Sequence, residues 1–176
     1  MCIVIDINFL SPLFNATDNE HNEFKPLLEW IIFGKGKLVY GGKKYKEELR
    51  ETKKYFGLLI QLKKAGKIVE VDDEKVDQHQ IKLSETEKHP DFDDPHLIAI
   101  IIVSGCKLIC SLDKRAYVFI KNKDLYPAHF EKPKIYKGKS NAKLLSDKNI
   151  AAVCHPVSKP NRLLKELLEK KVETIK

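Results

Sequence analysis

Short apolar runs that alternate with helix-forming segments are the feature that most constrains how this chain can fold. The run at residues 2–5 is continuous and rich in β-branched side chains, which is typical of a strand buried on both faces of a parallel sheet. Further strands are expected at residues 38–40, 67–71, 107–111, 134–136 and 151–153. Helices are expected at residues 9–14, 26–33, 43–64, 73–85, 95–104 and 161–173. This alternation predicts an α/β fold, with an α/β/α sandwich around a central parallel sheet and right-handed crossovers.

Composition limits the class of protein further. The chain has 176 residues, of which 43% are hydrophobic and 32% charged, so it can bury a core and is expected to be globular rather than disordered. No apolar run reaches the roughly 18 residues that a membrane span needs, and Asp6 interrupts the apolar N-terminus where a secretory signal would continue. We expect a main domain at residues 1–150 and a C-terminal helical extension at 151–176 packed on it.

The four cysteines give an expectation about location. Cys2, Cys106, Cys110 and Cys154 contain no CxxC pair. We interpret them as reduced thiols of a cytoplasmic protein, rather than as a disulfide framework or a zinc site.

Charge is distributed unevenly along the chain. Residues 1–113 carry 16 Lys/Arg and 19 Asp/Glu, a net charge of −3, whereas residues 114–176 carry 16 Lys/Arg and 6 Asp/Glu, a net charge of +10. A basic stretch beside an acidic region suits a polyanion whose phosphates contact lysines while metal ions bind the acids. The alternative is an ordinary solvated surface rich in lysine.

Acidic residues follow the expected strands or begin the expected helices. Asp6 follows the strand at 2–5, Asp113 follows the strand at 107–111, and Asp94 precedes the helix at 95–104. Glu47 and Glu48 lie in the first turns after the strand at 38–40. Because these positions share the carboxyl edge of a parallel sheet, we expect the carboxylates to converge and to need a divalent cation such as Mg²⁺ or Mn²⁺. Taken singly, each acid also has a structural interpretation as a helix cap, a turn residue or a surface charge.

Two segments resemble the signature of PIN-domain nucleases. Residues 4–10 (VIDINFL) resemble its opening motif, in which an aspartate and a small polar residue follow a hydrophobic strand. Residues 94–99 (DPHLIA) and 104–113 (SGCKLICSLD) resemble its second half, and their two aspartates lie 19 positions apart. The resemblance covers about residues 1–115. The resemblance implies a PIN-like fold and the activity of a metal-dependent ribonuclease. It also implies that the protein could be a toxin of a toxin–antitoxin pair, like the VapC-type members of that family.

The resemblance also implies roles for individual residues. Asp6, Asp94 and Asp113 match the acidic metal-binding positions, and Asn8 matches the small polar position that supports the first aspartate. Ser111, two residues before Asp113, matches a serine or threonine often found there and is taken as a further supporting residue. The internal catalytic glutamate corresponds to Glu48, which precedes a leucine, although Glu47 stays open. Lys114 and Arg115 are expected to hold the RNA backbone, while Arg115 also replaces a further acid that many members carry. The implied partners are RNA, an antitoxin protein or a second copy of the chain, without a membrane.

Three questions stay open at this point. Arg115 also fits an inactive PIN-like module that binds RNA or protein without cleavage. A phosphatase of the haloacid-dehalogenase type is a weaker alternative, because that family needs an aspartate where this chain has Asn8. His89 and His96 flank the acidic segment at residues 91–94, and either a ligand role or a simple polar contact suits them.

Overall fold

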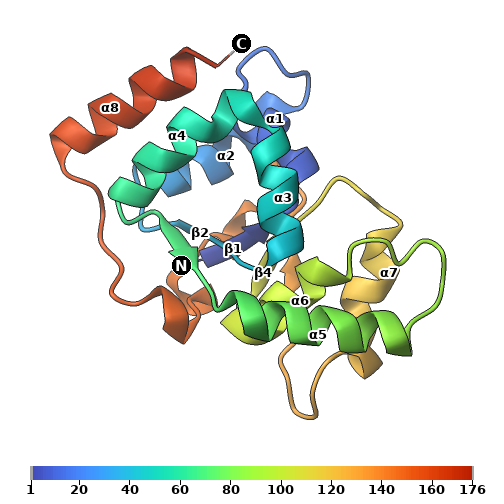
Figure 1. The fold of residues 1–176 in the computed structure, drawn as a ribbon. Helices are drawn as coiled ribbons and strands as arrows, with labels where there is room; N and C mark the ends of the chain where they lie inside the picture. Colours follow the sequence, from blue (N-terminus) through green and yellow to red (C-terminus); the bar gives the residue numbers. More distant parts are fainter. Residues whose placement is uncertain (1, 176) are drawn as a thin grey trace.

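A five-stranded, all-parallel sheet forms the centre of the computed structural model, which describes residues 2–175 (Figure 1). The strand order is β3-β2-β1-β4-β5, so β1 lies in the middle. The strands are β1 (Cys2–Ile5), β2 (Lys37–Tyr40), β3 (Ile68–Glu70), β4 (Leu108–Cys110) and β5 (Lys134–Ile135). From β1 the chain first adds β2 and β3 on one side and then β4 and β5 on the other, so the strand order reverses between β1 and β4.

Helices cover both sides of this sheet, as the predicted α/β class requires. In Figure 1, α1 to α4 lie on one side and α5 to α7 on the other. The helices are α1 (Leu10–Phe14), α2 (His21–Ile32), α3 (Lys43–Glu51), α4 (Lys53–Lys64), α5 (Asp73–Thr86), α6 (Pro95–Ser104), α7 (Ala116–Lys121) and α8 (Arg162–Glu173). Short 3₁₀ turns are η1 (Ile7–Phe9), η2 (Lys123–Leu125), η3 (Lys139–Leu144), η4 (Asp147–Asn149) and η5 (Ala152–Cys154). No helix among residues 2–175 is both long and apolar enough to cross a membrane.

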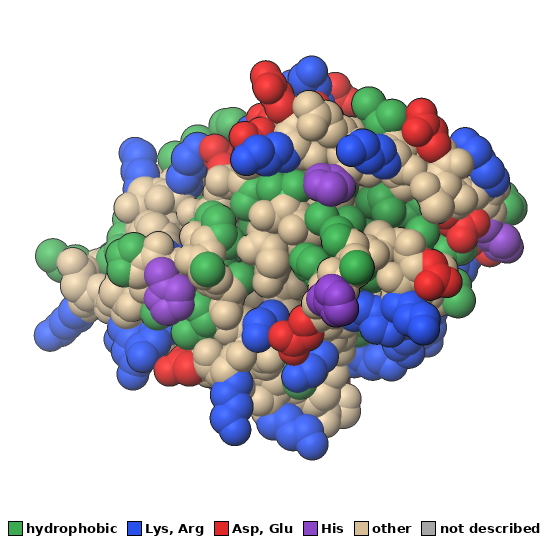
Figure 2. All heavy atoms as spheres, turned by 90° about the horizontal axis from the view of Figure 1, so that it is seen from below, with side chains coloured by type: hydrophobic (Ala, Val, Ile, Leu, Met, Phe, Trp, Pro, Cys, Tyr) green, Lys and Arg blue, Asp and Glu red, His purple; other side chains and the backbone are tan. Residues whose placement is uncertain are grey.

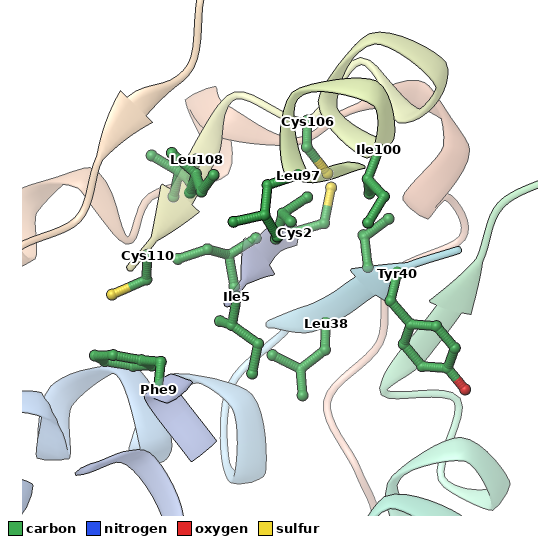
Figure 3. Close-up of a cluster of buried hydrophobic side chains, with 14 of the residues drawn as sticks. Cys2, Ile5, Phe9, Leu38, Tyr40, Leu97, Ile100, Cys106, Leu108 and Cys110 are labelled. Atoms are coloured by element: carbon green, nitrogen blue, oxygen red, sulfur yellow. The ribbon is translucent and has the colours of Figure 1, made fainter. Parts of the chain in front are cut away.

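The core is built around β1 and α6. All four residues of β1 are buried, so the strand can be apolar without alternation. Helix α6 is apolar on nearly every face because it is enclosed between the sheet and α5. Figure 3 shows Leu97 and Ile100 of α6 on one side of the sheet, and Phe9 and Leu38 on the other. This packing fixes the first turn of α6 against the end of the sheet where the acids gather.

The structure corrects three boundaries of the predicted elements. The helix expected at 43–64 is two helices, because Thr52 adopts a non-helical conformation (φ −90°, ψ 54°) and its hydroxyl donates to the Leu49 carbonyl oxygen at 2.7 Å. Helix α2 begins at His21, five residues earlier than expected, and includes Pro26 in its interior. The strand expected at 151–153 is wrong, since η5 occupies Ala152–Cys154 and the sheet ends at β5.

The expectation of four reduced thiols is also wrong. Cys2 and Cys154 form a disulfide, with their Cα atoms 6.3 Å apart, whereas Cys106 and Cys110 are free and buried. The bonded pair is separated by 152 positions in the sequence, so only the fold brings it together. Because disulfides are rare in cytosolic proteins, the cysteines no longer support a cytoplasmic location.

The C-terminal segment lies against the sheet and its helices. Lys67 is buried, and its Nζ donates to the carbonyl oxygens of Gly34 at 2.7 Å and Ser158 at 3.4 Å. Helix α8 packs on α4 and α2 through its apolar face, where Leu168 is fully buried. The segment therefore contributes side chains to the common core.

Leu168→Ala should lower the free energy of unfolding by about 2–4 kcal/mol, because it removes a fully buried side chain between α8 and α4. Chemical denaturation followed by circular dichroism measures this. Leu163, on the same helix and 77% exposed, is the matched control, and Leu163→Ala should change stability by less than about 0.5 kcal/mol. Equal effects of the two substitutions would show that α8 does not pack as described.

Candidate metal centre

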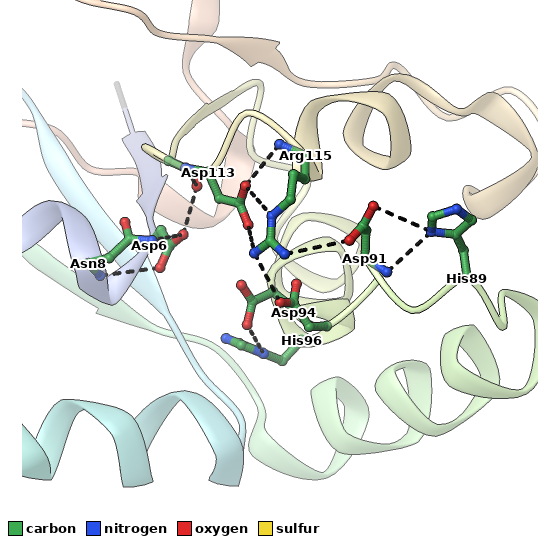
Figure 4. Close-up of polar contacts among 10 residues, drawn as sticks. Asp6, Asn8, His89, Asp91, Asp94, His96, Asp113 and Arg115 are labelled. Carbon is green, nitrogen blue, oxygen red and sulfur yellow. Dashed lines mark hydrogen bonds and ion pairs between the residues drawn. The ribbon is translucent and has the colours of Figure 1, made fainter.

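Asp6 is held at the carboxyl end of β1 by contacts from two strands. Its backbone N–H donates to the Cys110 carbonyl oxygen at 2.9 Å, which continues the pairing of β1 with β4. The Asp6 carboxylate is almost completely buried and accepts hydrogen bonds from Ser111 Oγ at 2.7 Å and Asn8 Nδ2 at 2.9 Å (Figure 4). Asn8 thus contacts the carboxylate that it is expected to support, and Ser111 is a second partner of the same carboxylate.

Glu48 and Asp94 approach from two helices. Asp94 is the N-cap residue of α6, yet its side chain makes no capping hydrogen bond. Carboxylate oxygens of Glu48 and Asp94 and one ring nitrogen of His96 all lie within 4.8 Å of one another. Glu47 is exposed on the same helix as Glu48. The structure therefore brings Glu48, and not Glu47, to the cluster.

Tyr45 positions α3 at the site, a role that its sequence context did not reveal. The phenol is buried, stacks on Tyr40 with ring centroids 5.5 Å apart, and donates to the Ile5 carbonyl oxygen at 2.8 Å. This bond ties the first turn of α3 to the last residue of β1, and Glu48 lies one turn further along α3. The sequence signal was a tyrosine three residues before a glutamate, which surface helices also show.

The carboxylates raise one another's proton affinity. Burial raises the pKa of Asp94 to about 7, and the charges of Asp6, Asp93, Glu48 and Asp113 add to this effect. Burial also raises the pKa of Asp6, in spite of its hydrogen bonds from Ser111 and Asn8, which lower it. Like charges that repel in a partly buried site are the arrangement that a bound divalent cation stabilises.

Arg115 neutralises part of the cluster. Its Nη2 and Nε atoms lie 2.7 Å and 3.1 Å from the two oxygens of Asp113, so the pair is bidentate. The same guanidinium lies 3.4 Å from Asp93 and 3.5 Å from Asp91. The Arg115 hydrogen bonds hold the pKa of Asp113 below its ordinary value. Arg115, expected to hold the RNA backbone, is thus engaged with the protein's own carboxylates.

The two histidines of this region occupy different places. His96 is buried beside Glu48 and Asp94, and burial lowers the pKa of its imidazole. His89 is exposed, packs against the Phe119 ring, and its Nδ1 accepts from the Asp91 backbone N–H at 3.2 Å. In Figure 4, His89 lies at the far side of Asp91 from Asp6 and Asp94. Only His96 of the pair faces the cluster.

A cleft opens next to the acids. It has a volume of about 450 Å³ and borders Ser111 and Leu112, which directly precede Asp113. Lysine and aromatic side chains form much of its lining, namely Lys114, Lys137, Phe24, Tyr117 and Tyr136. Lys137 Nζ lies 5.3 Å from the centre of the Tyr117 ring. Positive charge beside aromatic rings is a surface that single-stranded nucleic acids use. Figure 2 shows further clusters of Lys and Arg on one face of the molecule.

The four predicted acids are brought together unequally. Glu48 and Asp94 form a close group with His96, with ligand atoms within 4.8 Å of one another. Asp6 and Asp113 lie outside this close group, although their charges still contribute to the raised pKa of Asp94. Hard carboxylate oxygens fit Mg²⁺ or Mn²⁺, and a bound cation would relieve the mutual repulsion of these carboxylates. The chain matches no protein-family model, no curated protein and no solved structure.

In the presence of a chelator, Asp94→Asn should make the protein more stable at pH 8, by on the order of 2 kcal/mol after allowance for solvent screening. The folded-state pKa of Asp94 is about 7 and the ordinary value is 3.8, so the unmodified protein loses stability as the pH rises through this interval. The gain should therefore shrink at pH 5. Urea denaturation at both pH values measures it.

Glu85→Gln, which removes an exposed carboxylate of α5, is the control and should show no such pH-dependent gain. A stability difference between Asp94→Asn and the unmodified protein that is the same at pH 5 and pH 8 would contradict the raised pKa.

Proposed function

We propose that this chain is a divalent-metal-dependent ribonuclease of the PIN-domain type. The observation that carries the proposal is the close group of Glu48, Asp94 and His96, whose pKa-raising neighbours include Asp6 and Asp113, near a cleft that Ser111, Lys114 and Lys137 border. The resemblance of residues 4–10 and 94–113 to the PIN signature supports the same conclusion. It is also the basis for proposing a cytoplasmic toxin whose partner is an antitoxin protein or a second copy of the chain.

Each acid has a distinct place in this mechanism. Asp6, Asp94 and Asp113 would hold Mg²⁺ or Mn²⁺, which supplies an activated water for attack on phosphorus and stabilises the charge that develops there. Ser111 and Asn8 orient the Asp6 carboxylate by hydrogen bonds at 2.7 Å and 2.9 Å. Glu48, whose carboxylate oxygen lies within 4.8 Å of ligand atoms of Asp94 and His96, would help to hold the same ion. No serine or cysteine nucleophile is required.

The cleft beside Ser111 supports RNA as the substrate. Lys114 and Lys137 border it and can neutralise phosphates on either side of the scissile bond. The net charge of +10 over residues 114–176 concentrates positive charge in the part of the chain that contributes these lysines. The half-buried Tyr117 ring in the lining is the aromatic side chain on which an unpaired base could stack.

Arg115 supports a second candidate, a PIN-like module that binds RNA without cleaving it. Its bidentate pairing with Asp113 occupies a carboxylate that a metal would need. A phosphatase of the haloacid-dehalogenase type is disfavoured, because Asn8 donates its amide to Asp6 and cannot act as an acid or base there. Metal-dependent cleavage therefore discriminates between the two PIN-like candidates.

Asp6→Asn should abolish Mn²⁺-dependent cleavage of a structured RNA, with a loss of at least 100-fold, while the fold persists because Ser111 and Asn8 still contact the side chain. The assay compares cleavage with Mn²⁺, with chelator and with the variant. Glu85→Gln is the control and should cleave at the unmodified rate. Undiminished cleavage by Asp6→Asn would refute the ribonuclease, and metal-independent RNA binding without cleavage would favour the inactive module.

The double substitution Lys114→Ala and Lys137→Ala should weaken binding of a single-stranded RNA at least fivefold and reduce the salt dependence of binding by about 1.4 units of logarithmic slope, about 0.7 for each lysine. Binding is measured by fluorescence anisotropy in chelator, which prevents cleavage. Lys170→Ala with Lys171→Ala removes the same charge from the exposed side of α8. An equal loss in this control pair would mean that charge alone, and not the cleft, binds RNA.

A further inference from the structure

His96 has an unusual environment for a buried histidine. Its side chain is 2% exposed, and its Nδ1 has no hydrogen-bond partner among residues 2–175. That nitrogen lies 3.8 Å from an oxygen of Asp94, and Nε2 lies 3.5 Å from an oxygen of Glu48, so both contacts are at or beyond the limit of a hydrogen bond. Buried polar atoms are normally paired, so these spacings indicate a group that the imidazole and the carboxylates share.

The spacings fit a single metal ion. Two ligand atoms that each lie about 2.1 Å from one transition-metal ion are themselves roughly 3–4 Å apart. One ring nitrogen binds one ion, so only one of the two separations, 3.8 Å from Nδ1 to Asp94 or 3.5 Å from Nε2 to Glu48, joins two ligands of the same ion, and each falls in that interval. The three side chains, from α3, the N-cap of α6 and its first turn, together place a nitrogen and two oxygens within 4.8 Å of one another.

The His96 ring is held in this orientation by packing. Tyr45 meets its edge with ring centroids 6.2 Å apart, and Tyr45 is itself anchored to the Ile5 carbonyl oxygen. Pro95 and Leu97, on either side in the chain, are both buried, so the first turn of α6 has little freedom to move. A pre-positioned nitrogen costs less conformational entropy on binding than a mobile one.

We propose that His96 is a nitrogen ligand of the cation at this centre and makes it a mixed histidine–carboxylate site that prefers a transition-metal ion such as Mn²⁺ to Mg²⁺. Imidazole nitrogen binds transition metals well, whereas Mg²⁺ favours oxygen ligands. The inference rests on the metal site of the proposed function and specifies which ion the site selects. It assigns His96 a direct contact with the ion rather than a polar contact at the edge of the site.

The test measures Mn²⁺ and Mg²⁺ binding to the full chain by isothermal titration calorimetry. The unmodified protein, His96→Gln and His89→Gln are compared. His96→Gln replaces the ring nitrogen with amide groups at similar length. It should weaken Mn²⁺ binding at least tenfold and change Mg²⁺ binding less than threefold. His89→Gln, which alters the neighbouring exposed histidine, should leave both affinities unchanged.

Pulsed electron paramagnetic resonance of Mn²⁺ bound to the unmodified protein gives a readout that needs no variant. Coupling to a ¹⁴N nucleus should be present, should vanish in His96→Gln and should persist in His89→Gln. Bound Mn²⁺ without nitrogen coupling overturns the proposal, even if His96→Gln fails to fold. An unchanged ratio of Mn²⁺ to Mg²⁺ affinity in folded His96→Gln overturns it as well.

The outcomes separate this inference from the proposed function. Nitrogen coupling in a protein that does not cleave RNA would refute the ribonuclease and leave the His96 assignment standing. Metal-dependent cleavage without nitrogen coupling would refute the His96 assignment alone. A protein that binds no Mn²⁺ would refute both.

Discussion

The pairing of β1 with β4 is the contact on which the geometry of the site depends. Ile5 and Cys110 are partners in this parallel ladder, and the Asp6 N–H extends it by one further hydrogen bond to Cys110. The residues that directly follow the two strands, Asp6 and Ser111, therefore lie side by side. Ser111 Oγ donates to the Asp6 carboxylate at 2.7 Å. The strand order reverses between these two strands, and this is the position at which open parallel sheets bind ligands. The buried carboxylate of Asp6 stands at this point.

Repulsion among partly buried carboxylates is the main electrostatic feature of this site. Asp6 and Asp94 both have raised pKa values, and in each the first cause is burial and a further cause is the charge of neighbouring carboxylates. The protein offsets this repulsion only in part, with Arg115 on Asp113 and Lys44 on Glu48. Asp94 makes no side-chain cap bond, and no lysine or arginine among residues 2–175 lies within ion-pair distance of it. Asp94 is thus an uncompensated carboxylate of the cluster, and it lies next to His96.

Local sequence patterns predicted most of the scaffold because the elements that carry the site have strong local signals. The β-branched run of β1 is typical of a buried strand. Pro95 begins α6, and Gly105, in the left-handed conformation (φ 64°), ends it. The break at Thr52 was not predictable, since the apolar pattern continues through it and a single hydroxyl contact with Leu49 determines it. The disulfide between Cys2 and Cys154 was missed for a related reason, because no local pattern links positions 152 residues apart.

The sequence by itself determined that strands and helices alternate from β1 to β4, and with it the edge of the sheet at which Asp6, Asp94 and Asp113 had to appear, since parallel strands share their carboxyl ends. It could not determine which of Glu47 and Glu48 turns inward, or that His96 is enclosed with two carboxylates. Those outcomes depend on the rotation of α3, fixed by the Tyr45 bond to Ile5, and on the packing of α6 against the sheet. Only the tertiary structure decides such side-chain directions, because a helix rotated by one residue turns each side chain by about 100° while its sequence pattern changes little.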